Sequence, residues 1–311
     1  MARDSTCVIL NPAAGAATEI ELRSIVGDGA EIWTTRQPRD GIALARRAVT
    51  EGFATVIAAG GDGTLNEVVN GLMPAPDRPD AVATVVCGVL PLGTGNDFAR
   101  TIGMPLEPRA AWGAIQERLT RRVDVAALER DRCERWFINM SVGGSIDQIH
   151  DRLTDEMKKR WGPFAYLLAG AEALTALLTE IGPHQVELRL DDGDPIELEV
   201  WSVAVANGRT VGGGITVAPE ADVADGLLDC VAIRGVRGLE MAKVAAAVAV
   251  GKHLDAASDA DGPVFFQRAR TIEVRSRPAM PFTTDGEVNP ASESFFTAHA
   301  SALEMIVGPE S

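Results

Sequence analysis

Short apolar runs alternate with amphipathic stretches over roughly the first third of the chain. A helix is predicted over Asp40–Glu51, where apolar residues recur at three- and four-residue spacing, and another over Leu65–Leu72. Short Gly-rich turns separate the elements. A β-α-β-α-β series predicts a mostly parallel sheet with helices on both faces, which binds ligands at the carboxyl ends of its strands. The predicted strands are Cys7–Leu10, Glu31–Thr34, Thr55–Ala59 and Val82–Leu90.

After Arg121 the pattern changes to short strands joined by turn signals such as Asp191–Pro195. This pattern predicts a mainly antiparallel, β-sandwich-like domain. Helical stretches at 152–180 and 238–254 interrupt it. The predicted strands are Val123–Leu128, Trp136–Val142, Gln185–Leu190, Ile196–Ala206, Leu228–Ile233, Thr271–Arg275 and Ser294–Phe296.

The length of 311 residues suits two domains. We place the boundary near residue 125, with an α/β nucleotide-binding domain over 1–125 and a β-rich domain over 126–311 whose last residues can return to the first domain. The net charge of -15 argues against non-specific nucleic-acid binding, which needs a basic surface. It also argues against strong electrostatic attraction to an anionic membrane.

Cysteine usage and the N-terminus bear on the cellular compartment. The four cysteines are scattered, with no Cys-x-x-Cys pair that would indicate zinc or a disulfide framework. The N-terminus runs directly into a predicted strand, without the apolar segment of a signal peptide. We therefore expect a cytoplasmic protein that is at most peripheral at the inner face of the membrane.

The segment Gly60–Thr64 follows a predicted strand and opens a predicted helix. Glycine lets a backbone approach phosphate closely, and the exposed N–H groups and helix dipole attract the anion. Asp62 repels phosphate unless a metal or a hydroxyl proton lies between them, which indicates Mg²⁺-assisted phosphoryl chemistry. Taken alone, the segment also fits a tight turn in which Asp62 and Thr64 cap the helix, although the phosphate-binding interpretation is favoured.

Two further loops of this kind follow other predicted strands. Leu92–Arg100 carries two glycines, a Thr, an Asn and an acid, and Asn11–Gly15 follows the first strand. Because all three loops belong to the same edge of the predicted sheet, they suit a nucleotide and its phosphates better than three unrelated turns.

Further motifs complete a recognisable series. They are Asn207-Gly208 with Gly212–Gly214, the Pro219–Asp229 segment with its Asp225-Gly226 and Leu228-Asp229 pairs, and Asp285-Gly286-Glu287. With the loops at 11–15, 60–64 and 93–100, the chain resembles the bacterial diacylglycerol kinase and related lipid kinases, the superfamily that also contains sphingosine and ceramide kinases. The resemblance extends through nearly the whole chain, and it depends on the order and spacing of the motifs together.

The resemblance implies an ATP-dependent lipid kinase that transfers the γ-phosphate of ATP to the hydroxyl of a lipid such as diacylglycerol, with Mg²⁺ as cofactor. The active site would lie in the cleft between the two domains. The residues that the resemblance assigns to ATP are Asn11, Pro12, Ala13, Ala14, Gly15, Thr35, Gly60, Gly61, Asp62, Gly63, Thr64, Leu65, Asn66, Glu67 and Thr94.

The resemblance also implies roles for several acids. Asp62, Asp97 and Asp124 would be linked to the catalytic metal and its waters, and Glu287 would be the general base on the lipid hydroxyl. A structural Mg²⁺ would be held through a pattern that falls on Asp222, Asp225 and Leu227, with backbone carbonyls as the donors at Asp222 and Leu227.

The residues themselves leave alternatives open. A primary alcohol is a poor nucleophile and needs a carboxylate to accept its proton, and Gly286 can bend the chain to project Glu287, but a solvated turn glutamate fits too. Asp225-Gly226 also fits a plain hairpin turn.

The chain departs from the family pattern in two loops. Ala14 replaces a Ser that is common before the glycine of the first loop, no cation follows it, and Ala224 replaces an Asp. Two alternatives stay open: an enzyme resembling NAD kinase, which shares the Gly-Gly-Asp-Gly-Thr loop, and a nucleotide-binding sensor without activity, which the altered first loop supports. A homodimer also stays open, because an exposed edge strand in either domain can pair.

Overall fold

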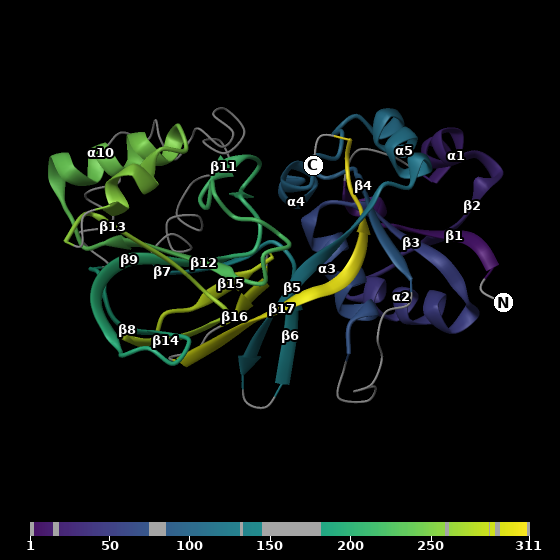
Figure 1. The fold of residues 1–311 in the computed structure, drawn as a ribbon. Coiled ribbons are helices and arrows are strands. Elements are labelled where there is room, and N and C mark those ends of the chain that lie inside the picture. Colours follow the sequence, from purple (N-terminus) through teal and green to yellow (C-terminus); the bar gives the residue numbers. More distant parts are fainter. Residues whose placement is uncertain are drawn as a thin grey trace.

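The chain folds as an α/β half and a mainly antiparallel half that lie side by side (Figure 1). The structure, a computed structural model, describes residues 3–14, 19–74, 85–130, 133–144, 182–258, 261–285, 287–289 and 293–309. The helical stretch predicted at 152–180 lies outside the described residues. Among the described helices, none is both long and apolar enough to cross a membrane.

The first half contains a parallel sheet with strand order β2-β1-β3-β4. Its elements are β1 (Arg3–Leu10), η1 (Pro12–Ala14), α1 (Glu19–Val26), η2 (Gly27–Gly29), β2 (Ala30–Thr34), α2 (Asp40–Glu51), β3 (Phe53–Gly60), α3 (Asp62–Leu72), β4 (Val86–Pro91), α4 (Asp97–Thr101) and α5 (Pro108–Glu117). The strands are nearly continuous apolar runs because helices cover both faces of the sheet (Figure 1). Helix α2 has the bounds predicted from its spacing and is capped at its C-terminus by Gly52, whose φ is 83°.

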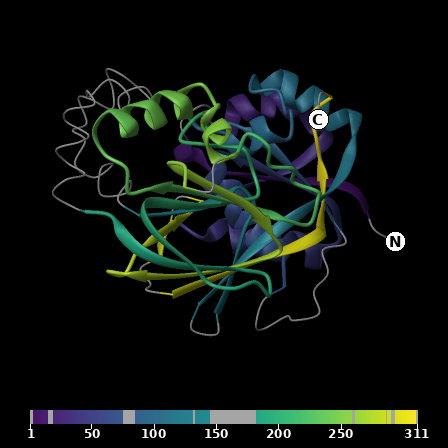
Figure 2. The same ribbon diagram turned by 60° about the vertical axis from the view of Figure 1, so that its left-hand side comes forward.

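The second half is built from antiparallel strands. Its elements are β5 (Thr120–Arg130), β6 (Cys133–Phe137), β7 (Met140–Gly144), β8 (His184–Leu190), β9 (Ile196–Ala206), β10 (Thr210–Val211), β11 (Ile215–Thr216), β12 (Leu228–Arg234), α10 (Gly238–Ala249), η4 (His253–Ser258), β13 (Val264–Ala269), β14 (Thr271–Arg277), β15 (Phe282–Thr284), β16 (Glu287–Asn289) and β17 (Glu293–Ile306). In β9, Val203 and Val205 pack into the core between the strand layers, whereas Ala204 belongs to a second cluster with Val244 of α10. Figure 2 shows α10 lying across this outer side of the sheet.

Strand β17 joins the two halves. It pairs with β14 at its start and with β5 along most of its length, and Met305 then pairs in parallel with Cys87 of β4. Phe296 therefore packs in the core of the second half and Met305 in that of the first. Figure 1 shows this strand returning to the first half.

The predicted fold class, a parallel α/β domain with an antiparallel β domain, is confirmed. The single strand predicted over Trp136–Val142 is wrong: β6 ends at Phe137 and β7 starts at Met140. The break occurs because the N–H groups of Ile138 and Met140 donate to the Asp285 carboxylate. The strand predicted over Ser294–Phe296 is too short, since β17 continues to Ile306.

Candidate active site

The loops that follow β3 and β4 cross at one edge of the parallel sheet. The N–H of Leu92 donates to the Gly60 carbonyl at 2.9 Å. A Cβ built on Gly93 would lie 2.5 Å from Gly61 Cα, so the two backbones are in direct contact. Only a residue without a side chain fits at this crossing.

The loop at 11–15, which follows β1, is joined to the loop at 60–64 through Asn11. Its N–H donates to the Ala59 carbonyl at 3.0 Å, and its side-chain amide donates to Thr64 Oγ1 at 3.1 Å. Thr64 is buried above Gly60, where any Cβ would overlap the hydroxyl. Pro12 and Ala13 are exposed in η1, Ala14 follows them, and Gly15 lies outside the described residues.

Asp62 joins the Gly-rich loop to the next helix. Its two carboxylate oxygens accept the N–H groups of Asp97 and Phe98 at 3.1 and 3.0 Å, so Asp62 caps the N-terminus of α4. Burial raises the pKa of Asp62, and the negative charge of Asp97 raises it further.

Asp97 connects α4 to the second half of the protein. Its carboxylate accepts the N–H groups of Gly213 and Gly214 at 2.9 and 2.8 Å. These glycines have φ of 91° and 111°, a region that favours glycine over other residues. A Cβ built on Gly95 would lie 3.0 Å from Asp62 Oδ2 and 3.1 Å from Asp97 Oδ2, so the two carboxylates flank Gly95.

The turn between β15 and β16 reaches the helix that follows the Gly-rich loop. Asp285 Oδ2 accepts the side-chain amide of Asn66 in α3 at 2.7 Å. Burial raises the pKa of Asp285 to about 6, and the charge of Asp62 contributes to the increase. Glu287 lies just beyond this turn and pairs with Thr284. The side chain of Glu287 lies outside the part of the chain that the structure describes.

Several residues that the resemblance assigns to ATP have other contacts here. Glu67 accepts the N–H groups of Arg39 and Gly41, both at 2.9 Å, and so holds the start of α2. Leu65 is buried in the apolar core. Thr35 is buried and donates its N–H to the Leu10 carbonyl at 2.9 Å, whereas Gly63 and Thr94 are exposed.

Comparison with known proteins identifies the family to which this chain is similar. A family model described as the diacylglycerol kinase catalytic domain matches residues 5–128, and one described as the YegS C-terminal NAD kinase beta sandwich-like domain matches residues 140–307. A relative from Chromohalobacter salexigens, named "Probable lipid kinase YegS-like", is 35% identical over 91% of this chain and 86% of its own length. This chain belongs to the diacylglycerol kinase family. The diacylglycerol kinase of Bacillus subtilis is 32% identical over 80% of this chain and 76% of its own.

Solved structures agree in fold with this member of the diacylglycerol kinase family. A diacylglycerol kinase from Bacillus anthracis has a TM-score of 0.72 at 22% identity and covers 99% of this chain, with 98% of its own chain covered. An NAD kinase from Archaeoglobus fulgidus in complex with ATP reaches a TM-score of 0.50 at 12% identity, covering 98% of this chain and 94% of its own. Identities this low show a common fold alone.

Asp124 of this diacylglycerol kinase family member lies where the two halves meet. Its carboxylate accepts the N–H groups of Ser301 and Gly226, both at 2.7 Å. Burial raises the pKa of Asp124, and repulsion from Asp225 and Asp222 adds to the increase. A cation at this point would relieve the repulsion between the carboxylates.

The segment 222–227 supplies oxygen donors of the kind that Mg²⁺ prefers. Asp225 Oδ1 accepts the N–H of Leu227 at 2.9 Å, while the Asp222 carboxylate pairs with Arg121 Nη2 at 2.9 Å. The backbone carbonyl of Asp222, which the resemblance implies as a metal donor, accepts the N–H of Asp225 at 3.4 Å. Among the described residues, no group of three His, Cys, Asp or Glu side chains is arranged to hold a metal, so the metal site stays a prediction.

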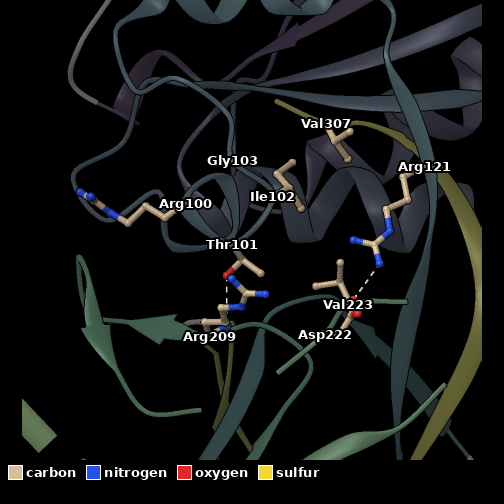
Figure 3. Close-up of a pocket in the computed structure, with 9 residues that line it drawn as sticks. All are labelled: Arg100, Thr101, Ile102, Gly103, Arg121, Arg209, Asp222, Val223 and Val307. Atoms are coloured by element: carbon tan, nitrogen blue, oxygen red, sulfur yellow. Dashed lines mark hydrogen bonds and ion pairs between the residues drawn. The ribbon is translucent and has the colours of Figure 1, made fainter. Parts of the chain in front are cut away.

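A cavity of about 340 Å³ lies beside this segment, between α4 and the loops of the second half. In Figure 3, Arg121 and Arg209 extend toward Asp222 and Val223, whereas Arg100 extends away from them. The N–H of Arg209 donates to Thr101 Oγ1 at 3.0 Å. Because Arg209 Nε also donates to the Ala221 carbonyl at 2.8 Å, Arg209 joins α4 to the residue that precedes Asp222.

Reasoning from sequence missed three structural roles in this site. Asn207 donates to the carbonyls of Asp124 and Ile138 at 3.2 and 2.6 Å, Gly213 and Gly214 bind Asp97, and Asp285 binds Asn66. These residues all lie in motifs that carry the resemblance to lipid kinases. Their place in those motifs was the sequence signal that could have indicated these roles.

Proposed function

We propose that this chain is an ATP-dependent lipid kinase that transfers the γ-phosphate of ATP to the hydroxyl of a lipid such as diacylglycerol. Its membership of the diacylglycerol kinase family carries the proposal. The meeting of Asp62, Asp97 and the Asp285 turn at the Gly-rich loops supports it, because phosphoryl transfer needs acids and backbone donors at one point.

The chain's own groups have distinct tasks in this proposal. The crossed backbones at Gly61 and Gly93 let the phosphates approach N–H groups closely. Asp62 and Asp97 would hold Mg²⁺, since each oxygen that accepts one N–H keeps a lone pair. When bound, the ion would neutralise charge developing on the phosphate oxygens.

Glu287 is the proposed general base. It accepts the proton of the lipid hydroxyl as the new O–P bond forms, and the bond from the γ-phosphorus to the β,γ-bridging oxygen breaks to release ADP. The position of Glu287 two residues after Asp285, which contacts α3, supports this role.

The test is incubation of the purified protein with labelled ATP and a panel of lipids, with and without Mg²⁺. The panel contains a diacylglycerol, a monoacylglycerol, a sphingoid base and an isoprenoid alcohol. We expect Mg²⁺-dependent labelling of at least one lipid, and loss of labelling in Glu287→Gln and Asp62→Ala with the fold retained. Full labelling by Glu287→Gln would show that the base is another group.

The same assay separates the other candidates. ATP binding without labelling of any lipid would indicate a nucleotide-binding sensor, which the altered first loop at Ala14 would explain. Labelling of NAD instead would indicate an NAD kinase, although the similarity to NAD kinases is one of fold alone.

A lipid acceptor requires the protein to reach a membrane surface. The net charge of -15 opposes an electrostatic mode of attachment. We therefore expect binding to lipid vesicles that changes little with salt, measured by sedimentation. A steep loss of binding from low to high salt would contradict this mode of contact.

A further inference from the structure

The carboxylate of Asp285 is where three parts of the protein meet. Asn66 of α3 donates to it at 2.7 Å. The N–H of Ile138, in the turn between β6 and β7, and that of Met140, the first residue of β7, donate at 3.1 and 3.2 Å. Asp285 itself belongs to the turn between β15 and β16. One side chain therefore links the helix behind the Gly-rich loop to the strand that carries Glu287.

The contact with α3 is part of a wider attachment. Asn66 also donates to the Trp136 carbonyl at 3.2 Å. One turn along the helix, Asn70 donates to that carbonyl at 2.8 Å and accepts the N–H of Trp136 at 3.2 Å. The polar face of α3 is thus fixed to the end of β6, next to the turn that binds Asp285.

The turn at 138–140 continues the connection toward Asp124. The side-chain amide of Asn207 donates to the Ile138 carbonyl at 2.6 Å and to the Asp124 carbonyl at 3.2 Å. The N–H groups of Ile138 and Met140 therefore bind the Asp285 carboxylate, while the Ile138 carbonyl binds the side chain of Asn207. Both connections lead to segments that carry acids of the proposed active site.

A carboxylate suits this position better than its amide. Three N–H donors converge on Asp285, and a carboxylate offers two acceptor oxygens, whereas an asparagine offers one and adds two donors of its own. Asn at position 285 would leave at least one donor poorly satisfied, and the turn would shift to compensate.

We propose that Asp285 is a positioning residue that binds α3 through Asn66 and thereby sets where Glu287 stands relative to the bound ATP. The inference rests on the proposed function, since it assigns Glu287 as the base. Asn66 then acts as a link between the two halves, and its side chain is not a ligand of the nucleotide.

The first test is steady-state kinetics of Asp285→Asn with the lipid that the wild type phosphorylates. Displacing the base by about 1 Å is expected to lower kcat by about 100-fold. The KM for ATP should change little, because Asp62 keeps its contacts with α4. A fall in ATP affinity with kcat unchanged would overturn the proposal.

Asp191 provides a matched control. It too is a turn aspartate with positive φ, 50° against 43° for Asp285. Its carboxylate accepts the N–H groups of Arg270 and Thr271 at 3.0 and 2.9 Å, within the second half. Asp191→Asn should keep the wild-type kcat. Equal kcat values for Asp285→Asn and Asp191→Asn would also overturn the proposal.

The second test approaches the link from the other half and needs no activity. Hydrogen exchange is measured in Asn66→Ala, in Asp191→Asn and in the wild type. We expect the amides of β15 and β16 to exchange faster in Asn66→Ala alone. Unchanged exchange in that variant would overturn the link. If the wild type phosphorylates no lipid, the proposed function fails, and exchange still decides whether the link exists.

Discussion

Replacing Gly93 by alanine tests the crossing of the two Gly-rich loops. The added Cβ would lie 2.5 Å from Gly61 Cα and 3.1 Å from Gly61 N, so backbone rather than a flexible side chain must yield. Overpacking of this kind costs about 1–3 kcal/mol. Because the Gly60 carbonyl accepts the N–H of Leu92 beside the clash, separating the loops also strains that hydrogen bond.

Gly63 supplies the comparison, since it lies two residues after Gly61, in the first turn of α3, and a Cβ built on it meets nothing within 4 Å. Urea unfolding should show Gly93→Ala less stable than the wild type by about 1–3 kcal/mol. Gly63→Ala should be as stable as the wild type or slightly more so, because alanine favours a helical position. Equal stabilities for the two variants would refute the direct backbone contact.

Three other outcomes are expected. Glu67→Gln should lose about 1 kcal/mol in urea unfolding, because Glu67 satisfies two N–H groups at the start of α2; no loss would contradict this capping. The Asp285 carboxyl has a pKa of about 6 in the folded protein, against 3.8 for an ordinary aspartate. Its contribution to the free energy of unfolding is therefore complete below pH 3.8, and it decreases as the pH rises to 6. The stability of the wild type relative to Asp285→Asn should therefore fall by at most about 3 kcal/mol across that range, and a rise would reverse the assignment. Added Mg²⁺ should raise the Tm of the wild type by more than that of Asp225→Ala, which keeps the proposed site at Asp62 and Asp97, and equal shifts would remove Asp225 from the metal site.

Sequence patterns predicted those helices and loops whose formation depends on residues close together in the chain. The spacing of apolar residues and the final Gly52 set the bounds of α2, and the strand-to-glycine transitions marked the loops at 11–15, 60–64 and 93–100. Parallel pairing then brings those loops to one edge, which follows from the fold class. The acids in the loops could therefore be named before their contacts were known.

Long-range contacts decided what the patterns could not. The break at 138–139 depends on Asp285, a residue 145 to 147 positions away in the chain. The length of β17 depends on its pairing with β4 and β5, since its final residues carry no distinctive signal. The internal contacts of Glu67 depend on how α2 and α3 pack, so a motif match could not reveal them.

The course of β17 has a consequence for synthesis on the ribosome. Leu303, Met305 and Ile306 fill the core of the first half, although most of that half is made from residues before 130. The α/β half therefore cannot complete its core during synthesis until residue 306 has left the exit tunnel. Until then it has an uncovered apolar face and an unpaired edge at β4. We expect this interval to be when a chaperone would engage the chain, and truncation before 303 to turn a folded enzyme into an aggregating one.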